Sequence, residues 1–102
     1  SKKTYIPELS FFLVENDQYV GYGQINRQEG CYFLVNFGIA PEFRGKGKSR
    51  GFLNAILSKA KALDIQEIYL DVNEDNFRAK ELYLSSGFQE ENSTCTWLYY
   101  IK

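Results

Sequence analysis

The stretch FRGKGKSRG, residues 43–51, places four cations and three glycines in nine positions. The 102-residue chain has a net charge of −1, and outside this stretch eight cations face thirteen acidic residues. The positive charge is therefore local. It indicates a site for one anionic ligand rather than a broad nucleic-acid surface.

Two common phosphate-binding patterns do not fit this stretch. A P-loop needs a glycine five residues before its Gly-Lys pair, and that position holds Glu42. The dinucleotide pattern GxGxxG finds Gly45 and Gly47, but Arg50 stands at its third glycine. A nucleic-acid loop is the other alternative, and the acidic remainder of the chain disfavours it.

Upstream of the basic stretch the chain reads as three strands. Apolar runs at residues 10–15 and 18–25, separated by the turn signal Asn16-Asp17, predict a β-hairpin. Residues 31–39 predict a long, mostly buried central strand. Gly38 near its end marks a bulge or a close approach of another backbone.

Downstream, helix and strand patterns alternate. The spacing of apolar residues predicts a helix over 49–63, with an inward stripe of Phe52, Leu53, Ile56, Leu57, Ala60 and Leu63. Residues 67–72 predict a strand, and 77–86 predict a helix that ends at Gly87. Residues 94–101 predict a last strand. The order β-β-β-α-β-α-β, in one domain over residues 1–102, predicts an α/β (α+β) fold with helices packed on a mixed sheet.

Composition excludes several kinds of site. The absence of histidine removes Ser-His-Asp triads, Cys-His dyads and most zinc sites, so no metal is expected. Cys31 and Cys95 are far apart in sequence and form no CxxC motif. We expect them to be reduced thiols of a cytoplasmic protein. No apolar run approaches the ~20 residues of a membrane span, so no membrane partner is expected.

Two stretches resemble motifs of the GNAT superfamily of acyl-CoA-dependent N-acyltransferases. Residues 44–49, RGKGKS, resemble its pyrophosphate loop R/Q-x-x-G-x-G/A. Residues 76–88, NFRAKELYLSSGF, resemble its helix N-x-x-A-x-x-L-Y-x-x-x-G-F. The two lie in the family's order, and the resemblance covers about residues 10–101. It implies a mostly antiparallel sheet whose central strands splay apart.

The chain departs from the family pattern at three places. Ser49 stands where Gly or Ala is usual, and Lys48 replaces a common aliphatic residue, so the start of the helix is expected to be exposed. Only nine residues precede the first strand, so the family's usual N-terminal strand and two helices are not expected. The isolated monomer is accordingly expected to bind CoA but to transfer acetyl groups weakly.

The resemblance implies that acetyl-CoA is the cosubstrate. Its pyrophosphate would be held by the loop, that is by Arg44, Gly45, Lys46, Gly47, Lys48 and Ser49. Its pantetheine arm would lie along Phe37, Gly38 and Ile39 and contact Asn76 and Tyr83. Several of these residues also have a structural alternative: a solvated surface for Arg44, core packing for Phe37, Ile39 and Tyr83, and an N-cap for Asn76.

The implied reaction is direct attack of an amine on the thioester. By resemblance, the Ile39 N–H would stabilise the oxyanion and Tyr83 would assist the leaving thiolate. Because a phenol of pKa ~10 is a weaker acid than a thiol of ~8.5, hydrogen-bond donation describes this assistance better than full proton transfer. No carboxylate lies in residues 31–37, so the general base stays open between Asp71, Glu15, Tyr22 and a water chain.

Two functions follow from the resemblance. The first is an N-acetyltransferase acting on a small amine or a peptide amine, which the intact Tyr83 favours. The alternative is a non-catalytic acyl-CoA-binding module or half of a larger protein, which the short N-terminus and missing base favour. No nucleic-acid partner is expected. A homodimer stays open through the apolar last strand TWLYYI, residues 96–101.

Overall fold

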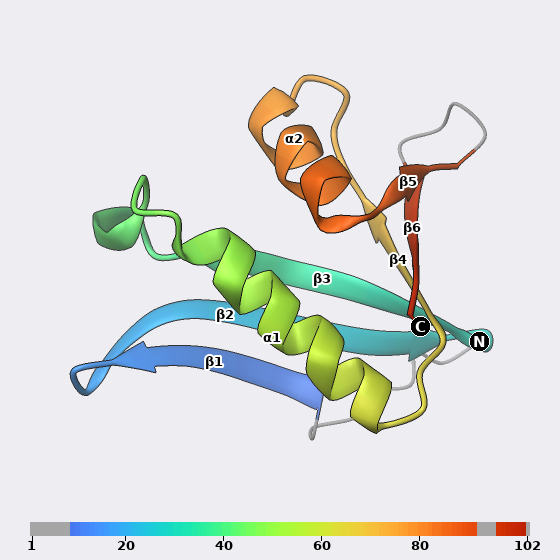
Figure 1. The fold of residues 1–102 in the computed structure, drawn as a ribbon, viewed down its shortest axis with the longest axis horizontal. Helices are drawn as coiled ribbons and strands as arrows, with labels where there is room; N and C mark the ends of the chain where they lie inside the picture. The colour runs from blue at the N-terminus through green and yellow to red at the C-terminus, as the bar shows by residue number, and fades with distance from the viewer. Residues whose placement is uncertain (1–8, 92–95, 102) are drawn as a thin grey trace.

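The computed structural model describes residues 9–91 and 96–101, which form six strands, two α-helices and a short 3-10 helix (Figure 1). The strands are β1 (Ser10–Glu15), β2 (Gln18–Gln28), β3 (Cys31–Ile39), β4 (Glu67–Asp71), β5 (Gln89–Glu90) and β6 (Thr96–Tyr100). The helices are η2 (Pro41–Phe43), α1 (Lys48–Ala62) and α2 (Phe77–Ser86). Predicted strand residues 94 and 95 lie outside the described residues.

The strands form one sheet in the order β1-β2-β3-β4-β6-β5. Every neighbouring pair is antiparallel except β3 and β4, which are parallel and joined through α1. The predicted mixed, mostly antiparallel sheet is confirmed. The sequence reading missed β5, whose two residues are strand only because they pair with Trp97 and Leu98 of β6.

Both α-helices pack on the same face of the sheet (Figure 1). Phe37 of β3 stacks on Phe52 of α1 at 5.5 Å between ring centroids and lies 6.4 Å from Tyr83 of α2. Glycines of β2 leave room for α1, because a Cβ at Gly23 would lie 2.8 Å from Ile56 Cδ1. This close packing holds α1 against β2 and β3.

The ends of the helices follow their local sequence. Asn76 caps α2, since its Oδ1 accepts a hydrogen bond from the Ala79 N–H at 3.1 Å, and Gly87 ends it at φ 107°. Helix α1 ends at Ala62, before Asp64 at φ 63°. Leu63 was wrongly included in the inward stripe: it lies past the helix end and is 49% exposed.

The central strand β3 carries a β-bulge just before Gly38. Tyr22 pairs with Gly38 and Gln24 with Val35, so two residues of β3, Asn36 and Phe37, face one residue of β2. Asn36 adopts φ 54°, the left-handed conformation that Asn tolerates better than other non-glycine residues. The sequence predicted a bulge or a close backbone approach at Gly38. The bulge lies at Asn36 and Phe37 instead, and the close approach is present, because a Cβ at Gly21 would lie 3.0 Å from the Gly38 carbonyl oxygen.

This conformation predicts the stability of two variants. Asn36→Val should lower the free energy of unfolding by about 1–3 kcal/mol, because a β-branched residue is strained at positive φ. Asn36→Gly, which relieves that strain, should be as stable as the wild type or more so. Urea unfolding monitored by circular dichroism measures both. Equal stability of the Val and Gly variants would contradict the left-handed bulge.

The sheet face away from the helices carries exposed aromatic side chains. Phe12 is 58% exposed and Tyr19 72% exposed, and their rings lie 5.4 Å apart. In β6, by contrast, Trp97 and Leu98 are buried within the chain. Among the described residues, neither helix has the length and apolar character needed to cross a membrane.

Candidate active site

A cleft opens where the two parallel strands separate. β3 and β4 pair at a single position, Phe33 with Tyr69, and then diverge. The gap has a volume of about 420 Å³ and is lined by residues 33–37, residues 70–73, Asn76, Ala79 and Tyr83. The predicted splaying of the central strands is therefore present, and α2 closes one side of the opening.

The backbone of Ile39 is oriented away from β2. The Ala40 N–H donates to the Val20 carbonyl at 2.7 Å, and Gly21 pairs with Ile39. Because hydrogen-bonded and non-hydrogen-bonded pairs alternate in an antiparallel ladder, Gly21–Ile39 is a non-hydrogen-bonded pair. The Ile39 N–H therefore points toward the β4 side of the strand, while its carbonyl accepts a hydrogen bond from Arg44 Nε at 2.9 Å.

The basic loop leads directly into α1. Gly45 and Gly47 adopt φ 78° and 73°, and a Cβ at either position would meet no atom within 4 Å. These glycines are thus required by backbone conformation, and the space above them is open. Helix α1 then begins at Lys48. Its first-turn N–H groups have no partners within the helix and form a site suited to an anion.

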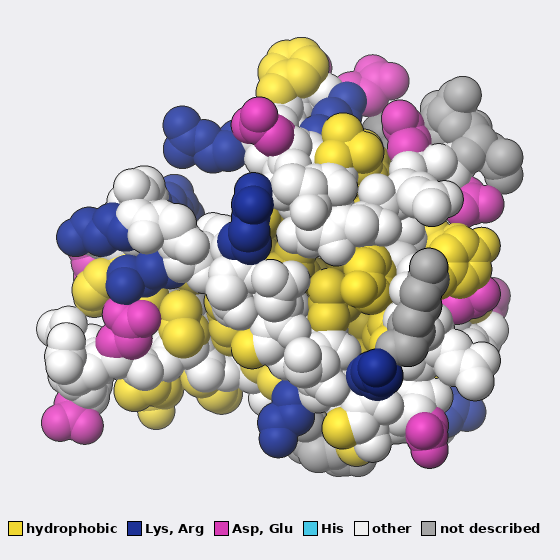
Figure 2. Space-filling view, viewed as in Figure 1, with side chains coloured by type: hydrophobic (Ala, Val, Ile, Leu, Met, Phe, Trp, Pro, Cys, Tyr) yellow, Lys and Arg dark blue, Asp and Glu magenta, His cyan; other side chains and the backbone are white. Residues whose placement is uncertain are grey.

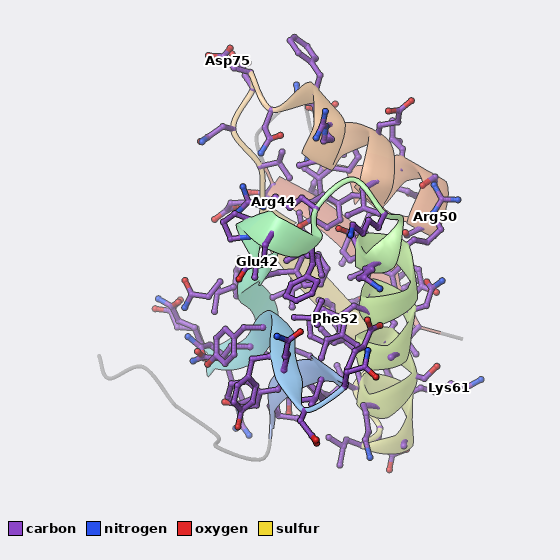
Figure 3. The ribbon with its side chains drawn as sticks, turned by 90° about the vertical axis from the view of Figure 1, so that its left-hand side faces the viewer. Glu42, Arg44, Arg50, Phe52, Lys61 and Asp75 are labelled. Atoms are coloured by element: carbon purple, nitrogen blue, oxygen red, sulfur yellow. The ribbon has the colours of Figure 1, made fainter. Side chains whose placement is uncertain are left out.

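Positive charge gathers at this end of the molecule (Figure 2). Figure 3 shows Arg44 beside the 3-10 helix, and Arg50 at the start of α1 near the end of α2. Arg50 donates to Ser85 Oγ at 2.9 Å, and Lys48 Nζ lies 2.7 Å from Glu15 Oε1. Lys48 is therefore not the freely exposed residue that was expected: it is partly buried and paired.

Tyr83 lies in the wall of the cleft. Its ring packs 5.4 Å from that of Phe88, and burial raises the pKa of its phenol above the ordinary value of 10.0. The phenol is therefore protonated at neutral pH. Its hydroxyl has no hydrogen-bond partner among residues 9–91 and 96–101, so the proton is available to a ligand in the cleft.

The structure brings only some of the predicted site residues together. Phe37, Asn76 and Tyr83 line the cleft, whereas Gly38, Ile39 and the loop residues do not. Asn76 also caps α2, so its structural alternative holds. Asn36 was missed as a residue of the cleft. Glu15 was an open candidate for the general base, but its contact with Lys48 was not predicted. A polar residue inside the apolar run CYFLVNFGI was the signal for Asn36, while no local signal linked Glu15 to Lys48.

A larger hollow of about 540 Å³ lies elsewhere, between α1, the end of α2 and β6. It contains none of the predicted site residues. The smaller cleft is the better candidate because Tyr83 faces it. The described residues include no group of three His, Cys, Asp or Glu side chains that could hold a metal ion.

Comparisons with known proteins agree with this arrangement. The chain is 30% identical over 82 residues to the ribosomal protein bS18-alanine N-acetyltransferase of Haemophilus influenzae, covering 80% of this chain and 56% of that one. Its fold is similar to Ard1 from Thermoplasma volcanium, with a TM-score of 0.80 and 19% identity over 94% of this chain and 72% of that one.

A second similar structure is PaiA N-acetyltransferase from Thermoplasma acidophilum in complex with coenzyme A. Its TM-score is 0.72 at 18% identity, over 85% of this chain and 57% of that one. The chain spans 37–56% of the length of the curated relatives it matches. The sequence profile described as the acetyltransferase (GNAT) family matches residues 3–88, and the chain belongs to that family.

Proposed function

We propose that this chain is the acyl-CoA-binding and catalytic part of an N-acetyltransferase that moves an acetyl group from acetyl-CoA to a primary amine. The observation that carries the proposal is the cleft between β3 and β4, with Phe37, Asn76 and Tyr83 in its wall. The open, glycine-containing loop before α1 supports it, because backbone N–H groups there suit a diphosphate.

In the proposed reaction, the amine nitrogen attacks the thioester carbonyl. A C–N bond forms, the C–S bond breaks, and the amine loses one proton. The Ile39 N–H would donate to the oxyanion, and the Tyr83 hydroxyl would donate a hydrogen bond to the departing thiolate. The raised pKa of Tyr83 supports hydrogen-bond donation over complete proton transfer.

The contacts of the three candidate side chains support one of them as the general base. Glu15 is paired with Lys48, and Tyr22 donates its hydroxyl proton to Gln24 at 2.8 Å. Among the described residues, Asp71 is the one carboxylate that lines the cleft, and its Oδ1 accepts a hydrogen bond from Thr96 Oγ1 at 3.0 Å. Of the three side chains left open by the sequence, Asp71 is therefore the best placed to receive the amine proton, directly or through water.

The acceptor is proposed to be a small amine or a peptide amine, and the protein is proposed to work in the cytoplasm. The Haemophilus influenzae relative is named as acting on a ribosomal-protein alanine. That name supports a peptide α-amine as the first acceptor to test. The homodimer stays a prediction. The apolar character of β6 does not by itself support it, because Trp97 and Leu98 are buried within the chain.

An assay of CoA release tests the proposed activity. The chain is incubated with acetyl-CoA and a panel of small amines and N-terminal peptides, and free thiol is measured with a chromogenic disulfide. Amine-dependent release is expected, with mass spectrometry showing the acetylated product. Tight CoA binding with no transfer to any acceptor would instead favour the second candidate, a non-catalytic acyl-CoA-binding module. That candidate is kept because no carboxylate lies on β3 beside the cleft.

A variant at Gly38 tests whether the pantetheine arm contacts this backbone, without a change in the stability of the fold. A Cβ at Gly38 would meet no atom within 4 Å, so Gly38→Ala should fold as well as the wild type. If the pantetheine arm runs along this backbone, the methyl group should still weaken CoA binding, by about tenfold for ~1.4 kcal/mol of lost contact. Calorimetric titration with CoA measures the effect. Unchanged affinity would place the arm elsewhere.

A further inference from the structure

The cations of the loop are largely engaged with the chain itself. Arg44 donates to the Ile39 carbonyl, Arg50 to Ser85 Oγ, and Lys48 to Glu15, at 2.9, 2.9 and 2.7 Å. Three of the four cations thus contact three different elements, the ends of β3 and β1 and the helix α2. The loop meets its ligand with most of its charged side chains already in contact with the protein.

The contact between Lys48 and Glu15 differs from the other two in its charge. A carbonyl and a hydroxyl leave the positive charge of their arginines intact, whereas the Glu15 carboxylate neutralises Lys48. Lys48 is the first residue of α1 and follows Gly47. Its ammonium group would therefore stand beside an anion bound at the helix N-terminus, if Glu15 did not hold it.

The position of Glu15 is fixed by the hairpin that carries it. It is the last residue of β1, and the turn residues after it, Asn16 and Asp17, both adopt left-handed conformations at φ 51° and 63°. In Figure 1 the tip of this hairpin and the start of α1 lie at the same end of the molecule. Glu15 and Lys48 are 33 residues apart in sequence, so the fold itself brings them together.

Stability does not account for this pair. The side chains of Lys48 and Glu15 are 24% and 41% exposed, so solvent reaches both and screens the pair, whose contribution to folding is accordingly small. The pair also neutralises one positive charge at the entrance of an anion site, where a free ammonium group would attract a bound anion directly.

We infer that Glu15 sets the affinity of the loop for the CoA diphosphate by holding Lys48 away from it. This inference rests on the proposed function, since it assigns a regulator of affinity to the same site. Glu15 does not line the cleft, and the inference gives it no contact with the ligand. It acts through Lys48, and its carboxylate keeps the affinity lower than the loop would otherwise give.

Calorimetric titrations with CoA at low salt test the inference. Glu15→Gln, which keeps the shape but removes the charge, should tighten binding about fivefold, the effect of roughly one charge in the first turn of a helix. The gain should shrink to less than about twofold at 1 M salt, where charges are screened. Pantetheine, which has no phosphate, should bind both proteins equally.

Two further variants show whether the effect passes through Lys48. Asp17→Asn removes a carboxylate from the same hairpin, two residues from Glu15, and should leave the affinity unchanged. In a Lys48→Met background, Glu15→Gln should tighten binding by less than about twofold, because no ammonium group is left to release. Equal gains with and without Lys48 would show a general effect of charge and overturn the inference.

The remaining outcomes separate this inference from the proposed function. Unchanged or weaker CoA binding by Glu15→Gln, with a wild-type chain that binds CoA, overturns the inference alone. A wild-type chain that binds no CoA at low salt overturns the proposed function, and the inference with it.

Discussion

Gly47→Val is expected to lower the affinity for CoA at least about a hundredfold, since losing two charge-assisted hydrogen bonds costs about 3 kcal/mol or more. Gly47 precedes α1 at φ 73°, and a Cβ there would project into open space. That space is where the diphosphate must approach the backbone N–H groups. A valine side chain would occupy it and would also strain the left-handed backbone.

Strain alone must be separated from this loss of contact. Gly30, in the turn between β2 and β3, has φ 81° and likewise meets no atom within 4 Å of an added Cβ. Gly30→Val should therefore lose a similar amount of stability, measured by urea unfolding, yet bind CoA like the wild type. An equal loss of CoA affinity in both variants would trace the effect to folding and remove the loop from the ligand site.

Tyr83→Phe is expected to lower kcat about a hundredfold or more, the usual cost of losing a positioned proton donor. The ring and its packing against Phe37 and Phe88 are retained, so CoA affinity should hardly change. Because the pKa of Tyr83 is raised, its phenol is protonated throughout the neutral range. The rate of the wild type should therefore not fall between about pH 7 and 9 through ionisation of Tyr83.

Tyr69→Phe is the matched control. Tyr69 packs against Phe33 at 5.5 Å between ring centroids and does not line the cleft. The turnover of Tyr69→Phe should stay within about twofold of the wild type, because loss of a hydroxyl outside the site has little effect on stability or on the cleft. Full turnover by Tyr83→Phe at saturating substrate would leave Tyr83 as a packing residue.

The order of elements could be predicted because each long element has its own periodicity. The apolar spacing of α1 and the alternation in β4 identified them without any tertiary information. Three features depend on pairing between strands, which the periodicity of a single element does not contain. β5 is a strand only through β6, the length of β2 follows its ladder with β3, and the bulge depends on the register that Asn36 and Phe37 adopt against Gly23.

The same division applies to the site. Gly47 and Tyr83 could be named from the sequence because each lies in a short stretch that resembles a motif of the family. Glu15 could not be linked to Lys48, since the contact joins two elements that only the folded sheet brings together. Ile39 was named by resemblance. The direction of its N–H follows from the pairing of β3 with β2, which no local pattern contains.

The most direct test of the central claim is to map the amide chemical shifts of the isotope-labelled chain as CoA is added. The proposed site predicts that the largest changes fall on residues 37–39, on the loop at 45–49, and on Asn76 and Tyr83. The amide chemical shifts of residues that line the larger hollow, such as Leu57 and Gln89, should not change. Saturable binding whose largest changes lie around that hollow, or no change at any amide, would contradict the assignment of the cleft and loop to CoA.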